Sequence, residues 1–164
     1  MSSSKTPEAT AAISFASPIG WVNIGAANEK IVWLTMTTSQ GHEFGKAKVL
    51  TEAKKQLQAY FAGKLTKFDL AVDLHGTEFQ RSVWKQIAKI PFGKTVSYAD
   101  IAVKIGKPLA SRAVGGAVGS NPVALIVGCH RVMGTSGRIT GYSGGEGIPT
   151  KRWLLAHEHI ESVD

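Results

Sequence analysis

Two long hydrophobic stretches, interrupted by short polar segments, follow a polar start of the chain. "ISFASPIGWVNIGA", residues 13–26, and "KIVWLTMTT", residues 30–38, are rich in β-branched and aromatic residues. The segments "SPIG" and "ANE" have the composition of turns. These patterns predict a small antiparallel sheet, and "FDLAVDL", residues 68–74, is a candidate for one further short strand.

Between these stretches and in the middle of the chain, apolar residues recur at helical spacing. Residues 47–63 place one apolar face on a predicted helix that Gly63 would stop, namely Leu50, Ala53, Leu57, Tyr60 and Phe61. In residues 75–93, Thr77 and Gln80 form a capping box that starts a second helix, which Pro91 ends. Its predicted buried stripe is Phe79, Val83, Trp84, Ile87 and Ile90.

Two short helices joined by a glycine turn follow. "SYADIAVKIG", residues 97–106, begins with Ser97 and Asp100 as a cap pair and ends at a glycine. "KPLASRAVGGAVGSNP", residues 107–122, supplies the next helix. This order is typical of a helix-turn-helix over about residues 97–120, although many helical hairpins share it.

The charge balance and the periodicity both change near residues 74–77. We therefore predict an α/β chain of the α+β kind with two domains. Residues 1–74 would form an N-terminal domain, an antiparallel sheet with a helix, after a loose tail over residues 1–11. Residues 75–164 would form a mainly helical C-terminal domain that carries the helix-turn-helix.

The net charge of +7 is unevenly distributed along the 164 residues. Residues 1–78 carry eight Lys and seven acids, whereas residues 79–152 carry eleven Lys or Arg and two acids. The second segment therefore has the composition of a polyanion-binding surface. A solvated basic surface without a partner is the alternative.

Compartment and cysteine content agree with an intracellular protein. No apolar stretch reaches the roughly 18 residues of a transmembrane helix, and the polar start lacks the apolar core of a secretory signal. One cysteine can form neither an internal disulfide nor a cysteine-rich zinc site. We expect no membrane association and a cytoplasmic or nucleoid-associated location, or a nuclear one in a eukaryotic cell.

The second helix of the predicted helix-turn-helix has almost no side-chain bulk. Gly115 and Gly116 each destabilise a helix interior by about 1 kcal/mol relative to Ala. Close packing on a neighbouring helix would explain them, and so would insertion into the minor groove of DNA, which is only ~6 Å wide. Arg112 is the one long polar side chain here, and it could contact a phosphate or enter the base stack.

Cys129 is the only cysteine, and it follows the apolar run "VALIVG", which predicts a short buried strand. A packed core residue is the simplest interpretation. However, His130 and Arg131 could favour a thiolate, and Glu158 lies on a predicted helix that Pro149 begins. A bridging water could connect the thiol to His130, with Glu158 orienting the imidazole.

Several segments occur together in the order and spacing of one known family. "FQRSVW", "IPFGKTVSYADIA", "SRAVGGAVGSNPVALIVGCHRV", "GYSGG" and "RWLLAHE" resemble the O6-alkylguanine-DNA alkyltransferases over about residues 77–160. The N-terminal stretch fits the first domain of that family more loosely.

The resemblance implies a role for each matching residue. Cys129 would accept the alkyl group, and His130 and Glu158 would deprotonate the Cys129 thiol through water. Asn121 would brace this relay, Tyr98 would donate a proton to the base, and Arg112 would fill the base stack. The other expected DNA contacts are Ser97, Ala113, Gly115, Gly116 and Arg131, and the expected base pocket is Tyr98, Val132, Tyr142 and Ser143.

The implied activity is an irreversible, single-turnover transfer from guanine O6 in DNA after the nucleotide has been flipped out. The expected partner is double-stranded DNA with O6-alkylguanine, with O4-alkylthymine as a further candidate. We expect a monomer, with cooperative binding on DNA left open, and neither a cofactor nor the zinc ion of some relatives. Relatives usually have proline where this chain has Gly128, so we predict a functional but less preorganised nucleophile.

Three other classes of function remain open at this point. A lesion-binding relative that only marks alkylated bases would lack the acceptor cysteine, so Cys129 argues against it. A helix-turn-helix regulator would need long polar side chains on the second helix. A cysteine hydrolase would need an oxyanion element, which the sequence does not provide.

Overall fold

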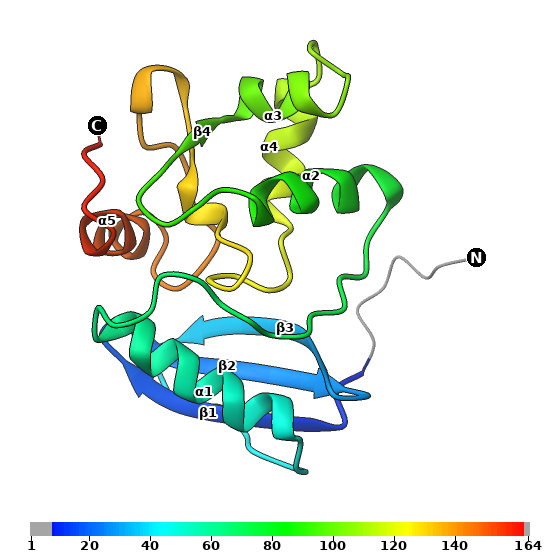
Figure 1. Ribbon diagram of the computed structural model, residues 1–164, viewed down its shortest axis with the longest axis vertical. Coiled ribbons are helices and arrows are strands. Elements are labelled where there is room, and N and C mark those ends of the chain that lie inside the picture. The colour runs from blue at the N-terminus through cyan, green and yellow to red at the C-terminus, as the bar shows by residue number, and fades with distance from the viewer. Residues whose placement is uncertain (1–7, 163–164) are drawn as a thin grey trace.

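The computed structural model describes residues 8–162, and its N-terminal half is a three-stranded sheet with one helix (Figure 1). The strands β1 (Ala11–Ser17), β2 (Gly20–Ala27) and β3 (Lys30–Thr37) pair antiparallel in sequence order. Helix α1 (Lys48–Phe61) packs across one face of the sheet. Its inner side chains Leu50, Ala53, Leu57 and Tyr60 are buried as predicted, and Gly63 adopts the left-handed conformation after the helix.

The C-terminal half is mainly helical. Helix α2 (Glu78–Ala88) and helix α3 (Tyr98–Lys104) each begin with the capping box that the sequence predicts. Helix α4 (Ser111–Gly119) packs on both of them. The remaining elements are the parallel pair β4 (Val96–Ser97) and β5 (Val132–Met133), the 3-10 turns η1 (Cys129–Arg131) and η2 (Thr135–Gly137), and helix α5 (Ile148–His157).

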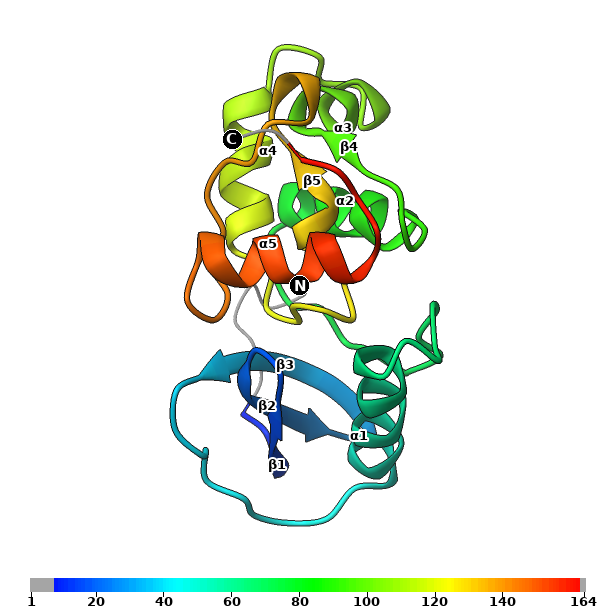
Figure 2. The same ribbon diagram turned by 90° about the vertical axis from the view of Figure 1, so that its left-hand side faces the viewer.

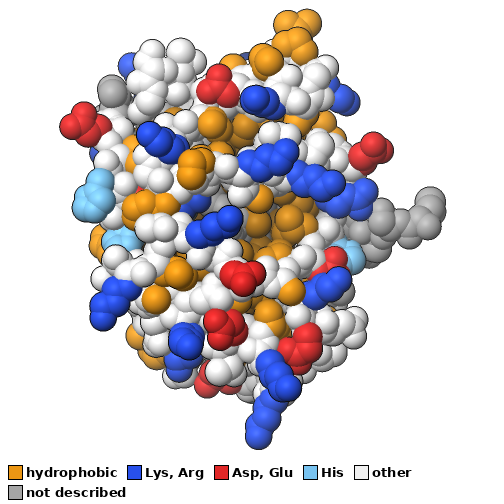
Figure 3. Space-filling view, viewed as in Figure 1, with side chains coloured by type: hydrophobic (Ala, Val, Ile, Leu, Met, Phe, Trp, Pro, Cys, Tyr) orange, Lys and Arg blue, Asp and Glu red, His pale blue; other side chains and the backbone are white. Residues whose placement is uncertain are grey.

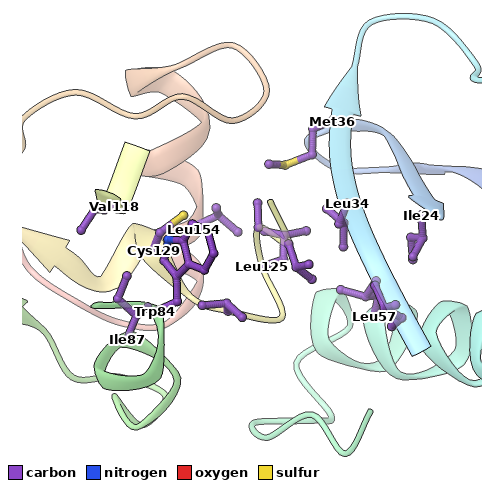
Figure 4. Close-up of a cluster of buried hydrophobic side chains, with 14 of the residues drawn as sticks. Ile24, Leu34, Met36, Leu57, Trp84, Ile87, Val118, Leu125, Cys129 and Leu154 are labelled. Atoms are coloured by element: carbon purple, nitrogen blue, oxygen red, sulfur yellow. The ribbon is translucent and has the colours of Figure 1, made fainter. Parts of the chain in front are cut away.

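The two halves share one hydrophobic core. Leu34 on β3 donates its backbone N–H to the carbonyl of Pro122 at 2.9 Å, so the segment before Cys129 lies against the sheet. Figure 4 shows Leu125 between Leu34 of the N-terminal half and Cys129 of the C-terminal half. Helix α5 lies at the edge of the C-terminal half that faces the sheet (Figure 2). The active-site region is therefore supported from both halves.

Two local predictions need correction. Residues 68–74 form a single bridge, between Val72 and Ile31, and no strand. The predicted loose tail is too long, because β1 already begins at Ala11 and Thr10 donates to the Ala26 carbonyl. Residues 1–7 of that tail lie outside the described residues.

Exposed basic side chains lie over helix α2. Lys85 on α2 and Lys89 just after its end are exposed, and Figure 3 shows Lys and Arg side chains gathered over this helix. Helix α4 lies behind α2 in that view (Figures 1 and 2). Within residues 8–162, no helix has the length and apolarity needed to cross a membrane.

Candidate active site

The approach to Cys129 is a series of tight turns. The predicted buried strand is wrong, because the backbone bonds here are local: Ile126 donates to Ala124 at 2.8 Å and Val127 donates to Val123 at 3.0 Å. The Asn121 amide donates to the Val127 carbonyl at 2.8 Å, and its oxygen accepts from Val123 N–H at 3.0 Å. Asn121 thus occupies the backbone groups that a strand partner would use, and it braces the turn before the cysteine.

Cys129 lies at a cavity of about 330 Å³ below the glycine face of α4. The lining residues are Tyr98, Gly115, Val118, Gly119, Cys129, Gly141, Tyr142 and Ser143. Three of the four predicted pocket residues thus surround the thiol. Val132 is the exception, because the structure places it outside this lining and its carbonyl accepts a hydrogen bond from Lys151 Nζ at 2.7 Å.

His130 and Glu158 form the predicted pair in the interior. The distance from His130 Nε2 to Glu158 Oε2 is 2.6 Å, and the two side chains are 0% exposed. An ionised carboxylate only accepts hydrogen bonds, so Nε2 carries the hydrogen. His130 Nδ1 is buried and has no hydrogen-bond partner within the described part of the chain. Its lone pair is therefore free to accept a proton.

Glu158 accepts hydrogen bonds from other residues as well as from His130. Its Oε1 accepts from Arg131 Nε at 2.8 Å and from Gly93 N–H at 3.1 Å. Its Oε2 also accepts from Tyr60 OH at 2.6 Å and from Arg131 Nη2 at 3.0 Å. The five donors occupy both oxygens of the carboxylate.

Arg131 is a buried partner of Glu158. Only 8% of the residue is exposed, and its Nη1 donates to the Ile90 carbonyl at 2.8 Å. The structure therefore contradicts the predicted DNA contact. A buried guanidinium requires a charge partner, and Glu158 provides it.

Burial acts on the pKa of Cys129, His130 and Glu158. It raises the pKa of the Cys129 thiol, against the opposing effects of Asn121, Tyr142 and Lys151. It lowers the pKa of His130, which Glu158 opposes, so the imidazole is kept neutral. Burial alone would raise the pKa of Glu158, but hydrogen bonds from His130 and Arg131 outweigh it and lower that pKa. The resting site thus pairs a neutral base with a thiol.

The outer face of α4 is nearly smooth. Arg112, Ala113 and Gly116 are exposed, and a Cβ added at Gly116 would meet no atom within 4 Å. At Gly115 the nearest atom would be 3.9 Å away, on the Tyr98 ring. Close packing within the protein therefore does not explain the two glycines, which leaves the groove hypothesis. The Ser97 hydroxyl accepts from Asp100 N–H as a cap, and a DNA contact at Ser97 stays a prediction.

Three residues of the site, Thr140, Lys151 and Tyr60, were not predicted from the sequence. Thr140 Oγ1 lies 2.8 Å from Tyr98 OH, the Lys151 amine donates to the Val132 carbonyl, and the Tyr60 hydroxyl donates to Glu158. Lys151 had a visible signal, since it shares the apolar face of α5 with Leu154. Within residues 8–162, no three His, Cys, Asp or Glu side chains are grouped to hold a metal.

Comparison with known proteins identifies relatives that match most of the chain. Residues 78–160 match the family described as "6-O-methylguanine DNA methyltransferase, DNA binding domain", and residues 13–74 match its "ribonuclease-like domain". A methylated-DNA–protein-cysteine methyltransferase of Mycolicibacterium paratuberculosis is 46% identical over 151 residues, which are 89% of this chain and 90% of the relative. One of Methanosarcina barkeri is 53% identical over 68% of this chain and 69% of its own length. The crystal structure of Mycobacterium tuberculosis OGT in complex with DNA superposes with a TM-score of 0.81 and 48% identity, covering 90% of this chain and 91% of the other.

Proposed function

Because this chain belongs to the O6-methylguanine DNA methyltransferase family, we propose that it repairs methylated DNA by taking the methyl group of guanine O6 onto Cys129. It is a methylated-DNA–protein-cysteine methyltransferase that binds damaged DNA. The observation that supports Cys129 as the acceptor is its place at the cavity, next to His130 with a free Nδ1. The thiol thus borders a space for the substrate, and the next residue carries an imidazole whose Nδ1 is free to accept a proton.

The proposed reaction moves one proton and one methyl group. The thiol proton passes to His130 Nδ1, directly or through a water molecule, while Glu158 holds the opposite edge of the ring. A bond forms from Cys129 Sγ to the methyl carbon as the carbon–O6 bond breaks, and its electron pair stays on the guanine. Tyr98 protonates the base, and the proton that His130 took from the thiol then passes, through water, to the Tyr98 phenolate, so His130 and Tyr98 both return to their neutral forms. The products are guanine and a thioether, so each molecule acts once.

The α4 surface supports an approach from the minor groove. A target base inside a duplex cannot reach a thiol that is 4% exposed, so the nucleotide must leave the stack. We assign Arg112 to the space that the base vacates, and Ala113, Gly115 and Gly116 to close contact with the backbone. The Ser143 loop and Tyr142 would hold the flipped base beside Cys129.

The proposal also covers the type of lesion, the oligomeric state and the domain organisation. The lesion would be O6-alkylguanine in duplex DNA, with O4-alkylthymine as a second substrate to test, and the protein would act as a monomer. We also propose a division into residues 1–74 and residues 75–164, which agrees with the ranges matched by the two family descriptions.

Peptide mass spectrometry tests the transfer directly. The protein is incubated with a duplex that contains one O6-methylguanine, and we expect one added methylene on the Cys129 peptide. Cys129→Ser and an unmethylated duplex are the controls, and neither should give the modified peptide. Tight binding to the methylated duplex without a modified peptide would refute the transfer and favour a lesion-binding protein.

A further inference from the structure

We propose that Tyr60, in the N-terminal half, is a positioning residue for methyl transfer because its hydroxyl holds the Glu158 carboxylate that orients His130. The inference rests on the proposed function, since it concerns the same relay. Three donors share Glu158 Oε2, namely Tyr60 OH, His130 Nε2 and Arg131 Nη2, and Tyr60 is the one of them that comes from the N-terminal half.

The geometry places the hydroxyl at the oxygen that faces the imidazole. Tyr60 OH and His130 Nε2 each lie 2.6 Å from Glu158 Oε2, although Tyr60 and Glu158 are 98 residues apart in the chain. Arg131 supplies bonds to both carboxylate oxygens, and Gly93 bonds only to Oε1. The Tyr60 hydroxyl therefore acts on the atom that His130 uses.

An aromatic cluster fixes the Tyr60 ring, which is 1% exposed. Phe68 and Phe92 lie 5.4 Å and 6.1 Å from its centroid, and the His157 ring lies 4.9 Å away in an edge-on arrangement. His157 also bonds to the Tyr60 carbonyl at 2.6 Å. Because these contacts come from both halves, the hydroxyl has one orientation.

Packing alone does not account for a tyrosine at this position. Phenylalanine would fill the same ring site without burying a hydroxyl, and an unbonded buried hydroxyl is unfavourable. Arg131 already balances the charge of Glu158, so the carboxylate does not need Tyr60 to remain ionised. The specific effect of the hydroxyl is to withdraw electron density from Oε2, and so to weaken the pull of Glu158 on the His130 N–H.

The direction of the effect follows from the groups around the relay. His130 faces Glu158, Arg131 and Lys151, and Tyr60 faces Glu158, Arg131 and His157. If the hydroxyl is removed, Oε2 becomes a stronger acceptor and the protonated imidazole is favoured. The pKa of His130 should then rise, and less of the neutral base is present at low pH.

The test compares Tyr60→Phe with Phe68→Leu, which loosens the same cluster but leaves the hydroxyl in place. The first measurement is the single-turnover rate of methyl transfer to a methylated duplex as a function of pH. We expect the acid limb of the Tyr60→Phe profile to move to higher pH by up to about one unit. Phe68→Leu should keep the wild-type limb.

The second measurement is the titration of the His130 ring by ¹⁵N NMR, which needs no methyl transfer. We expect a higher midpoint in Tyr60→Phe than in the wild type and in Phe68→Leu. Equal midpoints in all three proteins, or equal shifts in both variants, would overturn the inference and leave the wild-type transfer intact. If the wild type itself transfers no methyl group, the proposed function fails, and the NMR comparison alone decides whether Tyr60 controls His130.

Discussion

The substitution Glu158→Gln tests whether the Glu158 carboxylate both stabilises the folded protein and holds His130 for methyl transfer. The amide keeps the shape of the side chain but replaces one oxygen with an NH₂ group. Oε1 has the smaller number of donors, Arg131 Nε and Gly93 N–H, so the amide nitrogen will lie on that side. Two donors then face another donor, and Arg131 loses its only ion-pair partner within residues 8–162.

We expect this change to destabilise the protein by about 3 kcal/mol, since removal of one partner from a buried ion pair costs roughly 3–5 kcal/mol and the remaining oxygen retains part of the network. For a chain of this size that corresponds to a fall in Tm of about 6–12 °C. Glu161→Gln is the matched control, because Glu161 is an exposed carboxylate three residues further on. It should change the stability by less than about 0.5 kcal/mol.

The dependence of the free energy of unfolding on acidic pH gives an independent measurement. The pKa of Glu158 is lowered in the folded protein, so its contribution is present above the unfolded pKa of about 4.3 and is lost as the pH falls below it. Urea unfolding at pH 7, 4 and 3 should therefore show a smaller decrease in stability for Glu158→Gln than for the wild type. Methyl transfer should also slow by about tenfold or more, since a neutral amide oxygen accepts from the His130 N–H more weakly than the carboxylate does and stabilises the protonated imidazole less. A variant with wild-type stability and the wild-type acid limb would refute the carboxylate as the centre of this network.

Three further predictions concern the surface of α4 and the cysteine turn. Gly116→Ala should raise Tm by about 2–4 °C, because the position is open and glycine destabilises a helix. Gly116→Leu should weaken DNA binding in a fluorescence titration, and an unchanged affinity would exclude a close approach of α4 to DNA. Arg112→Ala should slow transfer from duplex DNA by about tenfold or more but leave the reaction with free O6-methylguanine base unchanged, and equal losses on both substrates would argue against base flipping. Gly128→Pro should raise both Tm and the transfer rate, because φ at Gly128 is −75° and already suits proline. The added Cβ would lie 3.2 Å from Arg131 Nη1, so this side chain must shift slightly. If neither Tm nor the transfer rate changes, Gly128 does not loosen the nucleophile.

Elements with a local signal in the sequence were predicted with nearly their observed bounds. The capping boxes at Thr77 and Ser97 involve residues three apart, and the β2–β3 turn needs only Asn28 and Glu29, both at positive φ. The run before Cys129 was mispredicted because its composition suits a strand and a buried turn equally. The difference comes from Asn121, whose side chain bonds to the backbone of the turn, and no periodicity reports such a bond.

The site divides in the same way. Cys129 and His130 are adjacent, and a motif identified Glu158, but Arg131 was expected to contact DNA and is instead buried as the partner of Glu158. Its pairing depends on a carboxylate 27 residues away. Tyr60 is more remote still: the helical pattern predicted that it is buried, but only the docking of the two halves shows what its hydroxyl contacts.

The charges around Cys129 are complementary to the reacting state of the thiol. Arg131 and Glu158 form one buried ion pair, and His130 is neutral. Lys151 is buried as well, but its Nζ donates to a neutral carbonyl, that of Val132, so its positive charge has no buried counterion within the described residues. Burial opposes a thiolate at Cys129, whereas Lys151 favours it, and a thiolate would in turn raise the lowered pKa of Lys151. The site therefore holds a proton on sulfur at rest and gains a charge partner for Lys151 when that proton leaves, which is the state that attacks the methyl carbon.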